Sequence, residues 1–282
     1  MKKSLKNNPN FNKKVERILA KEIDPGFYRR AKIILKNISI KGRMRVLDVG
    51  CGRGFYENAL SWLYPNATFV GIDAVEKYLS IARNSVGGNV SFYSMDARRM
   101  KFTGKSFDRF ICTEVLEHII EDERVVSEIL RVLKKGGEGI FTVPYANYPF
   151  LWDPANWVLE RLFNIHLPSH IWWISGIWAD HVRLYFENQL VTKLISKGFK
   201  IEKVWHTTRY CFPFAHFLLY GIGKNLVEAG IFKKGIDRFD YEEKSSLLTK
   251  ILKAPFFLVD RFNKDDNPGK SFLNLVVLVS KP

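Results

Sequence analysis

The chain has 282 residues, of which 46% are hydrophobic and 26% charged, and a formal net charge of +15. This composition is typical of a folded globular protein and excludes an intrinsically disordered one. No apolar run reaches the roughly 18 residues of a membrane-spanning helix or forms a secretory signal. The three cysteines, Cys51, Cys112 and Cys211, lack the spacing of disulfides or metal sites. We therefore expect a reducing, cytoplasmic environment.

The positive charge is concentrated at the two ends of the chain. Residues 1–45 have a net charge of +11, residues 46–197 of −1, and residues 198–282 of +5. Basic ends suit an anionic partner, which is either an acidic membrane surface or a phosphate backbone. A solvated surface that only keeps the protein soluble is the plain alternative.

Two basic amphipathic helices are predicted at the start, and together they form a cap over residues 1–42. The first spans residues 11–23 and ends at Pro25-Gly26. The second spans residues 27–38 and leads to a turn at Lys41-Gly42. In the first helix one face is apolar and carries Phe11, Val15, Ile18, Leu19 and Ile23.

Strand and helix patterns alternate from residue 43 to residue 145. The predicted strands are 44–49, 68–73, 90–95, 107–114 and 138–145, and the predicted helices are 55–64, 75–86 and 122–134. We expect the last helix to stop at the basic residues and glycines of 134–137. Such alternation predicts an α/β fold, with a doubly wound parallel sheet covered by helices on both faces.

Two insertions interrupt the later part of this pattern. Residues 146–180 are rich in aromatic residues and look like a lid, and residues 208–270 form an apolar and basic stretch that we expect to be irregular. Between them, residues 181–207 continue the core with a helix at 186–197 and a strand at 199–207. A closing strand lies within residues 271–282.

A glycine-rich turn follows the first core strand. The stretch VLDVGCGRG, Val46–Gly54, places glycines at positions 50, 52 and 54, with Asp48 two residues before the first of them. Dinucleotide-binding folds use G-x-G-x-x-G, but Phe55 stands where the third glycine would be. Nineteen residues after Gly54, the second strand ends in Asp73, which is placed to accept hydrogen bonds from ribose hydroxyls.

The order of these motifs resembles that of a known enzyme family. Val46–Gly54, Gly71-Ile72-Asp73, Met95-Asp96-Ala97 and Phe107–Ile119 are similar to the successive motifs of class I S-adenosylmethionine-dependent methyltransferases. The similarity covers roughly residues 44–145 and, more loosely, 181–207. It implies a Rossmann-like seven-stranded sheet whose last strand is antiparallel, with S-adenosyl-L-methionine as cofactor.

The resemblance also implies roles for single residues. Gly50 and Gly52 would border the methionine part of the cofactor, and Asp73 would hold the ribose. Asp96 and the backbone of Ala97 would meet the adenine, although Asp96 as a helix N-cap is the alternative. The complete implied set of cofactor-binding residues is Asp48, Gly50, Cys51, Gly52, Gly54, Asp73, Ala74, Asp96, Ala97 and Glu114.

Two further stretches resemble one group within that family, which is the methyltransferase type 11 or ubiquinone-biosynthesis-like group. These stretches are TEVLEHI at Thr113–Ile119 and the sequence His181–Val204. That group acts on quinone precursors and other small or lipid-like acceptors. The resemblance therefore implies methyl transfer to a small or lipid-like hydrophobic acceptor, with O-methylation favoured.

An acceptor hydroxyl needs a base, and His118 and His181 are the candidate catalytic residues. Some relatives with a similar E-x-x-E-H pattern bind a divalent cation, so Glu114, Glu117, His118 and His181 are a candidate metal set. Two carboxylates and two imidazoles suit manganese, iron or zinc better than magnesium. In the alternative without metal, Glu114 contacts the cofactor while Glu117 and His118 form local hydrogen bonds.

The two insertions bear on where the acceptor comes from. Five of the seven tryptophans lie in the first one, at Trp152, Trp157, Trp172, Trp173 and Trp178. They either line an apolar acceptor pocket, lie at a membrane interface, or form a separate core that joins the lid to the sheet. With the basic ends, they predict a peripheral enzyme at the inner face of a membrane.

Two other classes of protein compete with this interpretation. A nucleic-acid methyltransferase would also use the basic ends, but Thr113–Leu116 lacks the Asn/Asp-Pro-Pro-aromatic element typical of enzymes that methylate base amines. A non-catalytic S-adenosylmethionine-binding protein is the other class. The acceptor's identity and the oligomeric state do not follow from the sequence.

Overall fold

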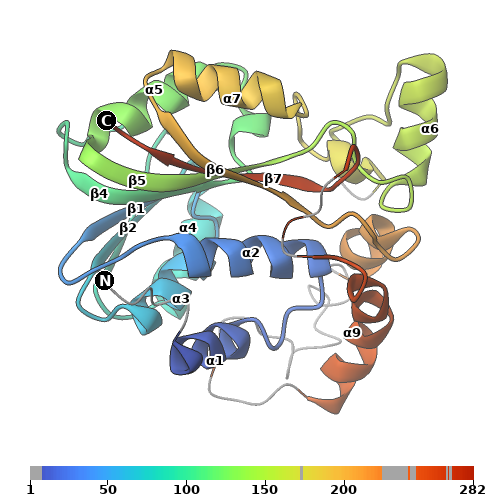
Figure 1. The fold of residues 1–282 in the computed structure, drawn as a ribbon, viewed down its shortest axis with the longest axis horizontal. Helices are drawn as coiled ribbons and strands as arrows, with labels where there is room; N and C mark the ends of the chain where they lie inside the picture. Colours follow the sequence, from blue (N-terminus) through green and yellow to red (C-terminus); the bar gives the residue numbers. More distant parts are fainter. Residues whose placement is uncertain (1–7, 172–173, 224–240, 242–245, 265, 267–268) are drawn as a thin grey trace.

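A computed structural model describes residues 8–171, 174–223, 241, 246–264, 266 and 269–282. Its centre is a seven-stranded sheet in the order β3-β2-β1-β4-β5-β7-β6 (Figure 1). β7 pairs antiparallel with both β5 and β6, and every other pairing is parallel. The predicted doubly wound sheet with an antiparallel last strand is confirmed. The strands are β1 (Arg45–Val49), β2 (Thr68–Asp73), β3 (Val90–Ser94), β4 (Phe107–Thr113), β5 (Leu133–Pro144), β6 (Lys200–Thr207) and β7 (Asn274–Ser280).

Helices cover both faces of the sheet (Figure 1). On one face, α5 (Asp122–Val132) and α7 (Glu187–Ser196) pack on the strands, and on the other lie α1 (Pro9–Ile18), α2 (Pro25–Asn37) and α3 (Phe55–Leu63). The remaining helical elements are α4 (Glu76–Ser85), η2 (Leu116–His118), α6 (Pro154–Phe163), η3 (Gly176–Trp178), η4 (Phe217–Gly223) and α9 (Leu247–Asp260).

The first helix is shorter than predicted. α1 ends at Ile18, and its buried face carries Phe11, Val15 and Ile18. The Glu22 carboxylate accepts hydrogen bonds from two consecutive backbone N–H groups, those of Ile23 and Asp24, each at 3.0 Å. These bonds turn the chain toward the N-cap of α2 at Asp24, so the helix does not continue to residue 23.

The stop of α5 also differs from the prediction. The helix ends at Val132, and residues 134–137 lie in β5. The pairing of β4 with β5 shifts register here, between Phe107 and Arg109, and Gly136 has a φ of +71°. The Lys134 ammonium lies 2.8 Å from the Asp108 carboxylate on β4. The basic residues and glycines therefore mark an irregular strand entry and not a helix end.

The two insertions form a small core of their own. Trp152, Ile177, Cys211 and Ala215 are buried together, and Trp157, Trp178 and Phe256 pack around them. For Trp152, Trp157 and Trp178 the separate-core alternative is therefore correct, while Trp172 and Trp173 lie outside the described residues. The second insertion was predicted to be irregular, but its described residues include η4 and the 14-residue helix α9.

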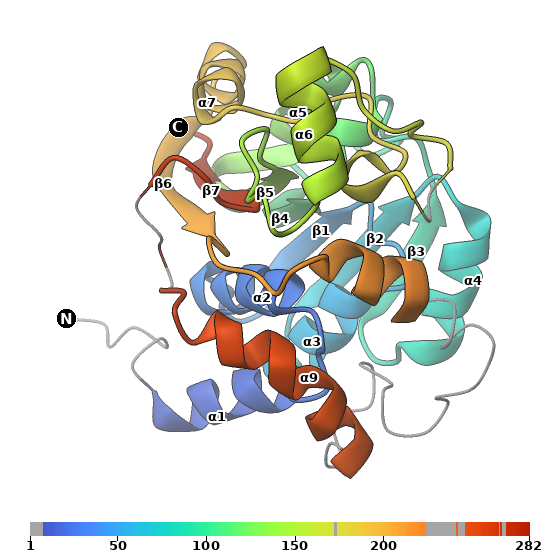
Figure 2. The ribbon, with the colours of Figure 1, turned by 90° about the vertical axis from the view of Figure 1, so that its right-hand side faces the viewer.

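Figure 2 places α6, the segment that contains η4, and α9 on one side of the molecule, next to the edge where the parallel strands end. The three cysteines are buried and free. Among the described residues, no helix is long and apolar enough to cross a bilayer.

Candidate functional site

The glycine turn leaves the carboxyl end of β1. Gly50, Gly52 and Gly54 all have positive φ, at +74°, +54° and +80°. The N–H groups of Gly50 and Cys51 donate to the carbonyl of Ile72 on the neighbouring strand, at 2.8 and 3.0 Å. A Cβ on Gly50 would lie 2.3 Å from Val115 Cγ2, whereas no atom lies within 4 Å of a Cβ on Gly52. Gly50 is thus packed against the β4 loop, while Gly52 leaves room for close approach of a ligand.

Asp73 ends β2 beside this turn. Its Oδ2 accepts from the N–H of Gly52 at 2.9 Å, and its Oδ1 accepts from the N–H of Val75 at 2.8 Å. A carboxylate has about four acceptor positions, so both oxygens can still accept from neighbouring ribose hydroxyls. Ala74 is exposed beside it. The turn and this acid fit the ribose and methionine parts of S-adenosylmethionine.

Asp96 follows β3 and forms a local turn. Its carboxylate accepts from the backbone N–H of Arg98 at 2.8 Å and pairs with the Arg98 guanidinium at 2.7 Å. The hydrogen bond from Arg98 lowers the pKa of Asp96. Residues 96–99 form a turn and not a helix start, so the helix N-cap alternative is wrong. Contact of Asp96 and Ala97 with adenine stays a prediction.

Two carboxyl groups are buried beneath the turn. Asp48 on β1 is 4% exposed and Glu57 on α3 is 1% exposed, and the two carboxyl groups interact with each other. Burial raises the pKa of both carboxyl groups well above the ordinary value, and the nearby Asp48 adds to the effect on Glu57. Burial also raises the pKa of the Cys51 thiol. Glu57 is a site residue that the sequence analysis missed.

Glu114, at the end of β4, is held by three other elements. It has a φ of +53°, and its carboxylate accepts from Thr142 Oγ1 at 2.8 Å and Asn274 Nδ2 at 2.9 Å. Arg30 of α2 forms an ion pair with it at 2.9 Å, with an Arg30 side chain that is only 13% exposed. These three partners were missed because no local motif points to them.

A second group of polar side chains forms where η2 meets the end of the first insertion. Glu117, His118 and His181 each offer a nitrogen or oxygen, and these atoms all lie within 4.8 Å of one another. The two imidazole rings are 4.6 Å apart, and His181 Nε2 is 3.9 Å from Glu117 Oε1. Of the four predicted metal ligands, the structure brings these three together, and Glu114 stands outside the group.

The hydrogen bonds of this group indicate its protonation. His118 Nδ1 lies 2.9 Å from the carbonyl oxygen of Asp180. Because a carbonyl only accepts, Nδ1 carries the hydrogen and Nε2 is left as a proton acceptor. Burial lowers the pKa of His181 to about 3, so that imidazole is neutral. Burial raises the pKa of Glu117, which is fully buried and has no hydrogen-bond partner among the described residues.

One carboxylate and two imidazoles are also a donor set for a divalent transition metal. Both oxygens of Glu117 and Nδ1 of His181 lack hydrogen-bond partners within the described part of the chain. The residues therefore fit a three-ligand site for iron, manganese or zinc.

Comparison with known proteins agrees with this geometry. Residues 46–137 match the family described as a methyltransferase domain. The ubiquinone biosynthesis O-methyltransferase of Coxiella burnetii is 30% identical over 122 residues, which cover 42% of this chain and 51% of that protein. The corresponding protein of Hahella chejuensis is 34% identical over 150 residues, covering 50% of this chain and 60% of that protein. The chain thus spans about half the length of these curated relatives.

Solved structures share the fold at low identity. A phosphoethanolamine N-methyltransferase of Haemonchus contortus in complex with S-adenosyl-L-methionine superposes with a TM-score of 0.56 at 19% identity, covering 99% of this chain and 59% of that chain. The cyclase SpnF gives a TM-score of 0.54 at 20% identity, covering 90% of this chain and 82% of that chain. Because a cyclase and a methyltransferase share this fold, the fold alone does not specify the reaction.

Proposed function

We propose that this chain is a class I S-adenosylmethionine-dependent methyltransferase and that it methylates a hydroxyl group of a small, lipid-like hydrophobic acceptor. Residues 46–137 match the methyltransferase-domain family. The observation that carries the proposal is the position of two groups at one edge of the sheet. The glycine turn with Asp73 follows β1 and β2, and the group of Glu117, His118 and His181 begins just after β4, the strand next to β1.

The cofactor supplies a methyl group on a positively charged sulfur, which is a good leaving group. The chain has to align the acceptor oxygen with the methyl group and the sulfur and to exclude water. As the new oxygen–carbon bond forms and the sulfur–carbon bond breaks, the hydroxyl proton must leave. His118 Nε2 is oriented to take it, since Nδ1 is held by the carbonyl of Asp180.

His181 has a positioning role in this proposal. A pKa near 3 makes it a weak base at neutral pH, so it cannot share the proton transfer equally with His118. Its neutral ring packs against the ring of His118 and lies close to the buried Glu117. An uncharged surrounding of this kind favours a hydrophobic acceptor over a charged one.

The relatives and the surface composition support the choice of acceptor. Two relatives are named ubiquinone biosynthesis O-methyltransferases, which favours oxygen as the methylated atom. The basic N-terminal cap and the apolar insertions favour uptake of the acceptor at a membrane surface by a peripherally bound enzyme.

The side-chain atoms of this group that lack hydrogen-bond partners among the described residues favour a second way to activate the acceptor hydroxyl, which is a bound metal. Glu117, His118 and His181 would hold a divalent metal, and such a metal lowers the pKa of a bound hydroxyl. Dialysis against a chelator, followed by metal analysis and readdition of zinc or manganese, separates the two candidates. A metal-free enzyme that keeps full activity rules out the metal.

The proposed function is tested by S-adenosylhomocysteine release with a series of prenylated phenols as acceptors and RNA as a comparison acceptor. We expect turnover on phenols by the wild type and none by Asp73→Ala. His206→Gln is the matched control, because His206 bonds Glu187 at 2.7 Å, away from the group of Glu117, His118 and His181. Turnover on RNA alone, or S-adenosylmethionine binding without turnover on any acceptor, would contradict the proposal.

A further inference from the structure

α9 has apolar side chains on two opposite sides. On one side it packs on α2, where the Phe257 ring lies 5.2 Å from the ring of Tyr28. On the opposite side, Leu247, Ile251, Leu258 and Phe262 are 74%, 60%, 58% and 71% exposed. Leu247, Ile251 and Leu258 are spaced by 4 and 7 residues, which places them in one stripe along the helix, and Phe262 lies in the turn just after it. An ordinary surface helix would carry polar residues there.

Neighbouring segments add further exposed apolar side chains on the same side of the molecule. Figure 2 shows α6 and α9 on the same side of the molecule, with the segment that contains η4 between them. Together with the stripe on α9, we refer to these exposed side chains as the apolar face: Leu162, Phe163, Ile165, Phe214, Leu218, Ile222, Leu247, Ile251, Leu258 and Phe262. A face of this extent on a folded protein marks an interaction surface.

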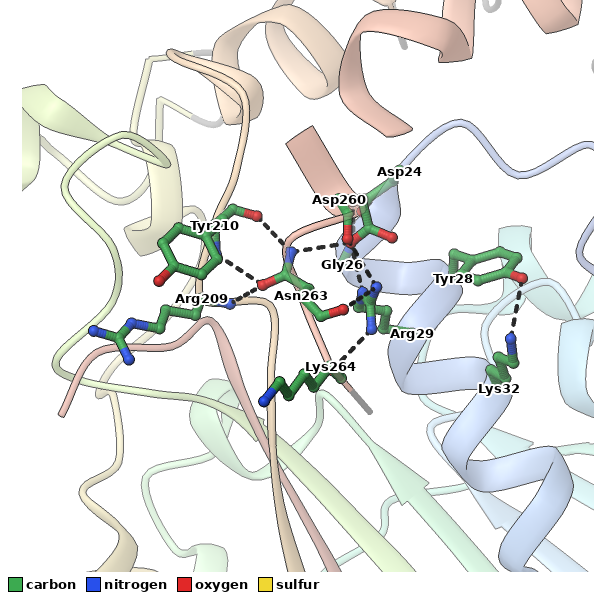
Figure 3. Close-up of polar contacts among 10 residues, drawn as sticks. All are labelled: Asp24, Gly26, Tyr28, Arg29, Lys32, Arg209, Tyr210, Asp260, Asn263 and Lys264. Atoms are coloured by element: carbon green, nitrogen blue, oxygen red, sulfur yellow. Dashed lines mark hydrogen bonds and ion pairs between the residues drawn. The ribbon is translucent and has the colours of Figure 1, made fainter. Parts of the chain in front are cut away.

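The surroundings of the apolar face are positively charged. Lys250 and Arg261 are exposed on α9 itself, next to the stripe. Arg209, Lys264 and Lys270 are exposed around it, and Figure 3 shows the first two side chains extending away from Asn263. Asp260 is buried in an ion pair with Arg29, and the exposed Asp266 lies 3.6 Å from His206, so the exposed cations named here outnumber the exposed acid among the described residues. An apolar stripe with cationic flanks is typical of helices that lie in the surface of an anionic bilayer.

α9 is fixed in place by a buried polar network (Figure 3). The Arg29 guanidinium donates to the Asp260 carboxylate and to the carbonyls of Asp260, Asn263 and Lys264. The Asn263 side chain in turn accepts from the backbone N–H groups of Arg209 and Tyr210. The apolar face is therefore built on a rigid support and needs no rearrangement to bind.

Two consecutive residues of α2, Arg29 and Arg30, connect this network to the proposed reaction site. Arg29 holds the end of α9, and Arg30 holds Glu114 at the end of β4. The apolar face thus lies on the side of the molecule where the carboxyl ends of β1, β4 and β5 meet.

We propose that the apolar face is a docking surface for an anionic lipid bilayer, with α9 lying in the interface and Lys250 and Arg261 contacting lipid phosphates. This inference rests on the proposed function, because docking in this orientation would present the site to an acceptor dissolved in the membrane. Membrane binding is nevertheless measured without any methyl transfer, so the two claims fail separately.

The test is co-flotation of the full chain with vesicles of phosphatidylcholine containing about one-third phosphatidylglycerol. We expect binding of the wild type and of the cofactor-site variant Asp73→Ala, and weaker binding at high salt. The double variant Ile251→Glu/Leu258→Glu should partition about tenfold less or worse, since two apolar side chains leave the interface and two negative charges face the lipid.

Ile195→Glu is the matched control, because Ile195 is 54% exposed on α7, outside the apolar face. It should bind vesicles like the wild type. Absence of binding to any vesicle, or an equal loss in Ile195→Glu and the double variant, overturns the proposal. So does a stable dimer in sedimentation analysis that dissociates in the double variant, because a second copy would then cover the apolar face.

Discussion

The proposed site has a cofactor half, formed by the glycine turn and Asp73, and an acceptor half, formed by Glu117, His118 and His181, and the two differ in how their polar groups are satisfied. In the cofactor half, both oxygens of Asp73 accept backbone N–H groups at 2.8 to 2.9 Å, so the site is organised before any ligand binds. In the acceptor half, Glu117 is fully buried and its oxygens have no hydrogen-bond partner among the described residues. In the proposed function the first half is preorganised for one ligand, and the second keeps polar atoms that a reaction partner can use.

The largest expected effect is in the acceptor half. His118→Gln should lower kcat by about 1,000-fold, the usual contribution of a general base, and leave cofactor affinity unchanged. His181→Gln should cost less, since His181 has a positioning role. Rates against pH should separate the two variants, because only loss of His118 removes the limb that the base produces. Equal kcat losses and identical pH profiles would contradict the division of roles.

The ion pair between Arg30 and Glu114 is expected to matter for folding. Arg30→Gln leaves the Glu114 carboxylate without its cation, which should lower the free energy of unfolding by about 3 kcal/mol. Arg83→Gln is the control, because its ion pair with Glu76 is mostly exposed and should contribute less than about 1 kcal/mol. Denaturant unfolding measures both. Equal effects would show that the ion pair of Arg30 with Glu114 contributes no more than an exposed one.

Two glycines sharpen the comparison within the cofactor half. An added Cβ at Gly50 meets Val115, so Gly50→Ala should destabilise the protein by about 3 kcal/mol. At Gly52 only the positive φ is unfavourable, and Gly52→Ala should cost about 1 kcal/mol. Gly52→Ala should instead weaken cofactor binding, because its methyl group fills the open space. Normal cofactor affinity in a folded Gly52→Ala protein would place the ligand elsewhere.

The smallest expected effect concerns the buried carboxyl pair. A folded-state pKa raised above the unfolded value means that the native protein keeps a proton that the unfolded chain releases. The stability from Glu57 is therefore present below about pH 4.5 and decreases as the pH rises toward the folded-state pKa. Glu57→Gln should flatten this decrease in the free energy of unfolding above pH 4.5. The exposed Glu76→Gln is the control, and superimposable curves for all three proteins would contradict the shift.

The sequence was sufficient for the sheet and the cofactor half because their signals are local. The glycine turn and Asp73 lie within 28 residues, and strand–helix alternation predicts the order of the elements. The partners of Glu114 could not be predicted, because Thr142 is 28 and Asn274 160 positions away and no spacing rule connects them. α9 was missed for a different reason. Pro255 lies inside the helix, and a proline within a helical pattern normally marks the end of a helix.

The most direct test of the central claim is calorimetric titration of S-adenosylmethionine into the wild type, Asp73→Asn and His118→Gln. If one half holds the cofactor and the other acts on the acceptor, the wild type and His118→Gln bind with equal affinity. Asp73→Asn should bind about 100-fold more weakly, since charge-assisted hydrogen bonds to the ribose are lost. No binding to the wild type, or equal weakening by both substitutions, would contradict the account.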